Sequence, residues 1–97
     1  MRFRPRLDAN QQAIVKELLR LGCSVQSLAS VGGGAPDLLV GYRGVSYLIE
    51  LKDGDKPPSA RKLTPKEADW HAKWKGQVAI AENINDVVKA IGLEEKT

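Results

Sequence analysis

The stretch from Gly34 to Lys52, GAPDLLVGYRGVSYLIELK, constrains the fold more than any other part of the chain. Two apolar runs flank Arg43-Gly44, which predicts two antiparallel strands joined by a tight turn. A turn centred there places Asp37 opposite Glu50. Because side chains alternate along a strand, Lys52 shares the face of Glu50. The hairpin therefore predicts two carboxylates and an ammonium group together at its open end.

Both faces of this hairpin carry apolar side chains. One face is expected to hold Leu38, Val40, Val45, Tyr47, Ile49 and Leu51, and the other Leu39, Gly41, Ser46 and Leu48 between the two acids. Strands that are apolar on both faces are typical of sheets that are covered on both sides. We therefore expect a central hairpin with helices packed on both of its faces, as in an α/β layer.

Apolar periodicity and capping signals predict the remaining elements. The expected elements are a helix over 8–21, a strand over 23–28, a helix over 65–75, a strand over 77–81, and a helix that follows Asn83 or Asn85 and ends at Gly92. A strand, a helix and a strand in succession imply a right-handed crossover, so the fourth strand should run parallel to the third. The predicted fold class is α/β (α+β), with an αβββαβ core, a central mixed four-stranded sheet and a C-terminal helix.

The helix starts carry their own signals. Asp8 or Asn10 is expected to cap the first helix, and Thr64 the second. Pro65 at the first position and Glu67 three residues after the cap make a capping box. In the first helix Gln11 lies one turn before an apolar stripe and should face the core, where a polar side chain needs a partner.

Composition places the chain among ordinary globular proteins. Its 97 residues are 42% hydrophobic and 28% charged, which predicts a single domain over 1–97, with a flexible basic arm over 1–7 and a flexible tail over 93–97. Cys23 is the lone cysteine, no Cys/His cluster has zinc spacing, and no apolar run has the length of a membrane span. These features predict a cytoplasmic protein. A net charge of +3 and a pI near 9.2 are compatible with a polyanionic partner.

Several residues outside the hairpin allow two interpretations. The loop over 53–63 holds Lys56, Arg61 and Lys62, and Lys66 follows just inside the next helix. These residues could contact a phosphate backbone or form a solvated charged surface. The glycine run 32–34 lacks phosphate-cradle spacing and is expected to be a sharp connection. Trp70 and Trp74 are expected in the core or a subunit interface rather than as a base-stacking platform. His71 is expected to be a helix-surface residue rather than a catalyst.

The open end of the hairpin predicts metal chemistry. Two carboxylates that face each other repel, unless a cation or a proton lies between them. Mg²⁺ or Mn²⁺ suits such oxygen ligands, and the carbonyl of Leu51 could add another. A metal at Asp37 and Glu50 would activate water and hold a phosphate oxygen, and Lys52 would stabilise developing charge. This arrangement fits metal-assisted phosphodiester hydrolysis.

The same residues resemble the signature of a known superfamily. Pro36-Asp37 followed by Glu50-Leu51-Lys52 is similar to the PD-(D/E)xK nuclease motif. The wider segments GGGAPDLLVG, LIELKDG and LTPKEADWH resemble the stand-alone VRR-NUC (virus-type replication-repair nuclease) branch, over roughly residues 8–91.

The resemblance implies a restriction-endonuclease-like core and Mg²⁺- or Mn²⁺-dependent cleavage of DNA, in a bacterial or phage-infected cell. It implies branched substrates such as Holliday junctions or flaps, a homodimer, and neither a nucleotide cofactor nor a membrane. Asp37 and Glu50 would be the metal ligands and Lys52 the catalytic lysine.

Two positions depart from the family pattern. Many relatives carry a glutamate that aligns with Gln11, so Gln11 is a weaker candidate ligand and a second metal is in question. Many relatives carry a glutamine where this chain has Glu67, which could serve the capping box or support contacts near the scissile phosphate. Two alternatives to a nuclease stay open: a DNA-structure-binding module that does not cut, and a domain in which Asp37, Glu50 and Lys52 form an ion-pair cluster at a sheet edge.

Overall fold

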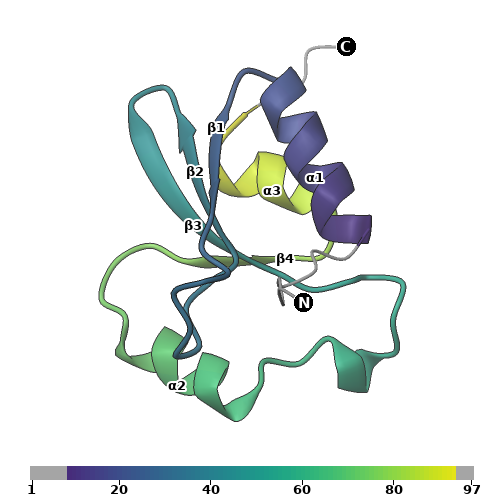
Figure 1. Cartoon of the computed structure of the whole chain (residues 1–97), viewed down its shortest axis with the longest axis vertical. Coiled ribbons are helices and arrows are strands. Elements are labelled where there is room, and N and C mark those ends of the chain that lie inside the picture. The colour runs from purple at the N-terminus through teal and green to yellow at the C-terminus, as the bar shows by residue number, and fades with distance from the viewer. Residues whose placement is uncertain (1–8, 94–97) are drawn as a thin grey trace, which may run out of the picture.

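A four-stranded mixed sheet is the framework of the computed structural model, which describes residues 9–93 (Figure 1). The strands are β1 (Ser24–Ser27), β2 (Leu38–Tyr42), β3 (Val45–Leu51) and β4 (Ala79–Ala81), in the order β1-β2-β3-β4. The first three strands are antiparallel, and β4 runs parallel to β3. The predicted parallel pairing of the fourth strand with the third is therefore confirmed.

Three α-helices complete the fold of the described residues. They are α1 (Ala9–Arg20), α2 (Pro65–Lys73) and α3 (Ile84–Ala90). A short 3₁₀ helix, η1 (Pro58–Ala60), lies in the loop over 53–63, which we call the basic loop. The mixed α+β class and the predicted αβββαβα order are confirmed. Among residues 9–93, none of the helices is both long enough and apolar enough to cross a bilayer.

The hairpin turn has the backbone that its sequence predicted. Arg43 and Gly44 both have positive φ angles, 52° and 80°, as a type I′ turn requires. The register pairs Leu38 with Ile49 and Leu39 with Leu48, so the predicted register is confirmed.

Capping bonds define the helix ends. Thr64 and Glu67 form the predicted capping box on α2, and the Asn83 side chain caps α3. Asn10 lies inside α1, so it is not the cap, and the expected Asp8 cap lies outside the described residues. Gly22, with a positive φ, closes the C-terminal end of α1 as predicted, and the Cys23 amide after it donates to the Leu18 carbonyl.

The last helix ends in the same way. The Leu93 amide donates to the Val88 carbonyl, and the Gly92 amide donates to the Lys89 carbonyl. Leu93, which was expected to begin the flexible tail, is instead buried in the core because this motif turns it back onto the helix. The expected arm over 1–7 and the rest of the tail, 94–97, lie outside the described residues.

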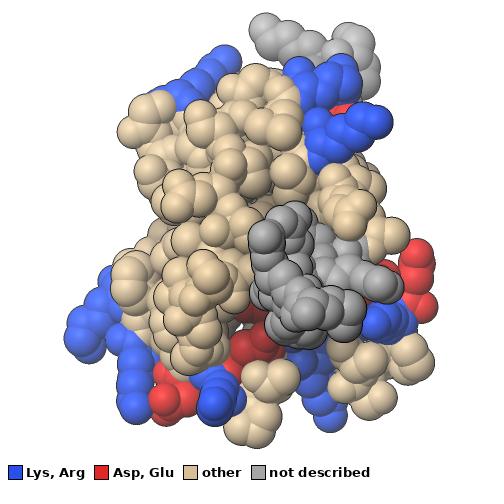
Figure 2. Space-filling model, in the orientation of Figure 1, with Lys and Arg blue, Asp and Glu red and all other residues tan. Residues whose placement is uncertain are grey.

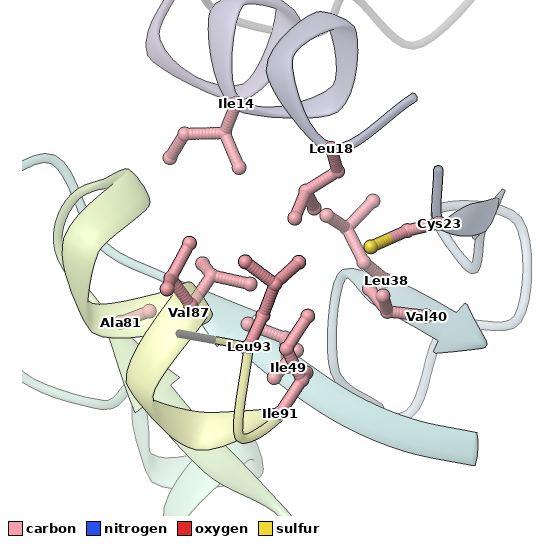
Figure 3. Close-up of a cluster of buried hydrophobic side chains, with 11 residues drawn as sticks. Ile14, Leu18, Cys23, Leu38, Val40, Ile49, Ala81, Val87, Ile91 and Leu93 are labelled. Carbon is pink, nitrogen blue, oxygen red and sulfur yellow. The ribbon is translucent and has the colours of Figure 1, made fainter. Parts of the chain in front are cut away.

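The core lies on one face of the sheet only. Leu38, Val40 and Ile49 on that face are fully buried beneath α1 and α3 (Figure 3). On the other face Leu39 and Leu48 are only half-buried. Helix α2 lies beyond the open end of the hairpin rather than over this second face (Figure 1). The expectation of helices on both faces is therefore wrong, and this second face stays open.

Two element ends differ from the prediction because side chains intervene. The Gln77 side chain bonds both the amide and the carbonyl of Leu48, at 2.7 and 3.1 Å, and so takes the place of a strand backbone where β4 was expected to begin. Helix α2 ends at Lys73 rather than Lys75. The helix does not continue to Lys75 because Trp74 adopts an extended backbone, and its indole Nε1 donates to the Gln77 carbonyl.

Candidate active site

Asp37 sits at the entrance to β2 and is fixed across the hairpin. Its amide donates to the Ile49 carbonyl, at 3.1 Å. Its Oδ2 accepts a hydrogen bond of 2.7 Å from the Leu51 amide. The Asp37 carboxylate is thus held at the end of β3 by backbone that the hairpin register places there.

Glu50 is the most unusual charged residue of the described chain, because its side chain is buried although it is an acid. The residue is 1% exposed, and its Oε1 has no hydrogen-bond partner. The pKa of Glu50 is raised to about 9, chiefly by burial. A hydrogen bond with Asp37 and the negative charges of Asp37 and Glu67 raise the pKa further, whereas the charge of Lys52 lowers it. In the absence of a cation the two opposed carboxyl groups therefore keep a proton at neutral pH.

Lys52 joins the hairpin to α2. Its Nζ lies 2.7 Å from Glu67 Oε1 and 3.8 Å from Glu50 Oε2. The same Glu67 oxygen accepts the Thr64 amide at 2.8 Å, so the capping box also holds the lysine. Burial by itself would raise the pKa of Glu67, but the hydrogen bonds from Lys52 and Thr64 outweigh it and hold the pKa below its usual value.

His71 also belongs to this site, which the sequence interpretation missed. Its Nε2 lies 3.8 Å from Glu50 Oε1, is buried and has no hydrogen-bond partner. With a side chain only 13% exposed, it is not the surface residue that was expected. The available signal was its spacing, since His71 lies four residues after Glu67 and so on the same face of α2.

Gly34 sets the position of α2 relative to the hairpin. A Cβ at Gly34 would lie 2.3 Å from the Lys66 carbonyl oxygen, and its φ is +85°. Only glycine allows the loop before Asp37 to pass so close to the first turn of α2. The glycine run is therefore a close connection, as predicted, and it brings the capping box to the carboxylates.

The remaining predicted residues lie around this centre. Gln11 is buried on α1, as its spacing predicted, and its role as a ligand stays a prediction. Lys56, Lys62 and Lys66 are exposed, whereas Arg61 Nη1 pairs with Glu82 Oε1 at 3.2 Å. Figure 2 shows basic and acidic side chains together over the lower half of the molecule, where Figure 1 places α2 and the loop before it.

The donor set at the site fits a hard divalent cation. Asp37 and Glu50 contribute carboxylate oxygens, and Glu50 Oε1 is a buried acceptor in need of a positive partner. Within residues 9–93 no three His, Cys, Asp or Glu side chains are arranged to hold a metal by themselves. Two carboxylates completed by other oxygens suit Mg²⁺ or Mn²⁺, since Mg²⁺ keeps several of its waters when it is bound by protein.

Comparisons with known proteins give one informative relative. No protein-family model matches the sequence, and no curated protein matches it. A solved structure described as a VRR_NUC domain matches with a TM-score of 0.60 and 28% sequence identity, over 84% of this chain and 89% of that chain. The chain is therefore similar in fold and in sequence to a VRR-NUC domain, which supports the nuclease-type domain that the sequence resemblance implied.

Proposed function

We propose that this protein is a metal-dependent DNA endonuclease that hydrolyses phosphodiester bonds. The observation that carries the proposal is the convergence of Asp37, Glu50 and Lys52, with a buried Glu50 oxygen that lacks a partner. An ordinary ion-pair cluster would not leave such an acceptor unpaired. The VRR-NUC fold supports the same conclusion.

The two carboxylates would hold the cation. Asp37 and Glu50 are the proposed ligands, together with the Leu51 carbonyl and, as a weaker candidate, Gln11. A bound Mg²⁺ or Mn²⁺ supplies Lewis-acid activation of a water and of a phosphate oxygen. The bond from the Leu51 amide keeps the Asp37 carboxylate in one orientation, so little reorganisation is needed when the site is occupied.

Lys52 is the proposed catalytic lysine. Its ammonium group is fixed by Glu67 beside the carboxylates, and from there it would stabilise charge that develops on the phosphate or orient the attacking water. His71 faces Glu50 Oε1 from the other side, and we assign it the role of orienting that carboxylate. The helix that carries Glu67 and His71 thus supports Glu50 of β3 and Lys52, which directly follows β3.

Branched DNA, such as a Holliday junction or a flap, is the proposed substrate. The exposed lysines at 56, 62 and 66 follow Lys52 along the chain and would contact the phosphates on either side of the cleaved bond. A positive net charge favours a polyanionic substrate.

A homodimer is the proposed assembly. Four aliphatic side chains are exposed in the described chain and would supply apolar surface for a subunit contact, namely Leu19, Val31, Val45 and Ile80. Light scattering at micromolar concentration should report a dimer. A mass equal to one chain would contradict this proposal.

The catalytic proposal is tested with labelled duplex, flap and four-way-junction DNA. We expect cleavage with Mg²⁺ or Mn²⁺, no cleavage with a chelator, and preference for a branched substrate. Asp37→Ala and Lys52→Ala should each remove at least about 99% of the activity, since each deletes a group that acts on the transition state. Cleavage that survives both substitutions would contradict the assigned roles. Junction binding with no product under any metal would instead identify a binding module that does not cut.

A further inference from the structure

A pocket on the open face of the sheet has no role in the catalytic site. It has a volume of about 330 Å³ and is lined by Leu39, Ser46 and Leu48 from the hairpin, and by Trp74 and Gln77 from the segment that leaves α2. This volume lies at the lower end of the range for ligand pockets, roughly 300–1,000 Å³. An aromatic ring is a suitable occupant for a small pocket with leucine and indole walls.

Trp74 is exposed and yet held in one orientation. Its indole is stacked on Trp70, with ring centroids 4.7 Å apart and an interplanar angle of 18°. Its Nε1 donates to the Gln77 carbonyl at 3.0 Å, and Gly76 leaves room for the ring, since a Cβ there would lie 2.8 Å from Nε1. The residue nevertheless stays 45% exposed. A preordered aromatic surface binds a ring at a low cost in conformational entropy.

The polar groups of the pocket are mostly engaged. The Gln77 side-chain oxygen and nitrogen both bond to the Leu48 backbone, at 2.7 and 3.1 Å, so the amide is committed to the sheet. Only the Ser46 hydroxyl adds a polar side chain. Such a pocket recognises a ring by stacking and apolar contact rather than by reading a hydrogen-bond pattern.

The surroundings of Trp74 connect the pocket to the proposed catalytic site and place positive charge beside it. Trp74 stacks on Trp70, Trp70 lies edge-on to His71, and His71 faces Glu50. Lys73 and Lys75 flank Trp74 in the sequence and are exposed. The Lys73 pair with Asp69 is solvent-exposed and therefore weak. An aromatic ring between two cations is complementary to a base with its neighbouring phosphates.

We propose that this pocket binds an unpaired nucleobase of the DNA strand, stacked on Trp74, beside the phosphate that lies at the catalytic residues. The inference rests on the proposed nuclease function and adds a substrate feature to it. A base held out of the duplex is available in flaps, gaps and open junctions, but not in intact duplex. Stacking accepts all four bases, so the pocket selects unpaired DNA without selecting its sequence.

The test uses a gapped duplex that carries the fluorescent base 2-aminopurine at each unpaired position in turn, or an abasic site at the same position. A chelator keeps a metal-dependent nuclease from cutting the DNA. We expect wild-type protein to quench the fluorescence at one position, and the matching abasic site to weaken binding roughly five- to hundredfold. Trp74→Leu should abolish this quenching and weaken binding by a similar factor, whereas Trp74→Phe should retain both.

Controls separate stacking from other effects. The abasic site should weaken the Trp74→Leu protein no further, because both changes remove the same contact. Lys75→Ala should weaken base-containing and abasic DNA equally, and Lys16→Ala, at an exposed position on α1, should change neither. Circular dichroism checks that each variant is folded.

The outcomes separate this inference from the proposed function. A wild-type protein that cuts branched DNA but binds base-containing and abasic DNA equally would overturn the base pocket alone. If Trp74→Leu converts a dimer to a monomer and weakens both DNAs equally, the pocket is a subunit contact and the inference is wrong. Base-dependent binding without cleavage in Mg²⁺ or Mn²⁺ would support the pocket and contradict the nuclease function.

Discussion

Glu50 is the residue of the site whose ionisation is most strongly disfavoured by its surroundings. Its pKa is raised from 4.5 to about 9, first by burial and then by Asp37 and Glu67. In the metal-free protein the folded state therefore holds a proton that the unfolded state has released between these two pH values. This difference makes stability depend on pH.

We expect the free energy of unfolding of the metal-free protein to fall as pH rises from about 4.5 to about 9. The folded state binds the extra proton, so stability is highest below the unfolded pKa and is lost up to the folded pKa, at a slope of at most ~1.4 kcal/mol per pH unit. Glu50→Gln, which resembles the protonated acid, should remove this slope and make the protein more stable than wild type at pH 8. Urea unfolding with a chelator, from pH 6 to pH 9, measures it.

Glu17→Gln is the matched control for this experiment. The pKa of Glu17 is lowered by its hydrogen bond with Arg20, so it does not titrate in the same range and the slope should persist. An unchanged slope in Glu50→Gln would show that another group takes up the proton.

Glu67 has a structural and a positioning role that two substitutions separate. Glu67→Gln keeps an oxygen that can accept from both Lys52 and Thr64, whereas Glu67→Ala removes it. We expect Glu67→Ala to lower kcat at least tenfold, because Lys52 loses its anchor, and to lower stability by about 1 kcal/mol through loss of the capping box. Glu67→Gln should stay within threefold of wild-type kcat. Equal losses in the two variants would show that the negative charge, and not the hydrogen bonds, is needed.

At the scale of elements, the close approach of the glycine loop to α2 decides whether the site assembles. The helix carries Glu67 and His71, and the loop leads into Asp37, so a small displacement between them would separate the proposed catalytic groups. The contact is between backbones, at Gly34 and Lys66, and leaves no side chain that could adjust.

Gly34→Ala should therefore lower both stability and activity. The new Cβ would meet the Lys66 carbonyl and has to displace the helix, so we expect a loss of about 2–4 kcal/mol and at least a hundredfold loss in kcat. Gly33→Ala is the control, since its φ is also positive, at +67°, but no atom lies within 4 Å of its Cβ. It should cost only the backbone strain, about 1–2 kcal/mol, and preserve kcat. Thermal melts and initial rates on the preferred substrate measure both. Similar kinetics in the two variants would contradict the role of the contact.

At the scale of the whole molecule, the two faces of the sheet differ in what they carry. Helices α1 and α3 bury one face and form the core (Figure 1). The carboxylates of Asp37 and Glu50 and the Trp74 pocket belong to the other face. A substrate that reaches both proposed sites would therefore approach from the side that α1 and α3 leave uncovered.

The exposed lysines of the basic loop and of the first turn of α2 should dominate the salt dependence of DNA binding. Each phosphate contact contributes a slope of roughly 0.9 in log K against log salt concentration, so combined alanine substitution of Lys56, Lys62 and Lys66 should reduce the slope by up to about 3. Fluorescence anisotropy over a salt series measures it. Substitution of Lys16 and Lys89, on α1 and α3, should leave the slope unchanged. If these control lysines have the larger effect, DNA binds over the helices and not at the loop.

Local sequence signals determine the hairpin register and the helix ends of this protein without reference to tertiary packing. The hairpin register follows from the turn at Arg43-Gly44 and from side-chain alternation, so the pairing that brings Asp37 to Glu50 could be predicted. The capping box at Thr64 and the glycine at the end of each of α1 and α3 are likewise local signals, each readable within a few residues.

Tertiary contacts alone decided where α2 lies. Apolar periodicity shows that a sheet face can be covered, but not which helix covers it, because docking depends on atoms distant in the sequence. The passage of Gly34 against Lys66 and the bond from Lys52 to Glu67 hold α2 beyond the end of the sheet. That position turns His71 toward Glu50 and leaves Trp74 exposed, which the spacing of these residues could not show.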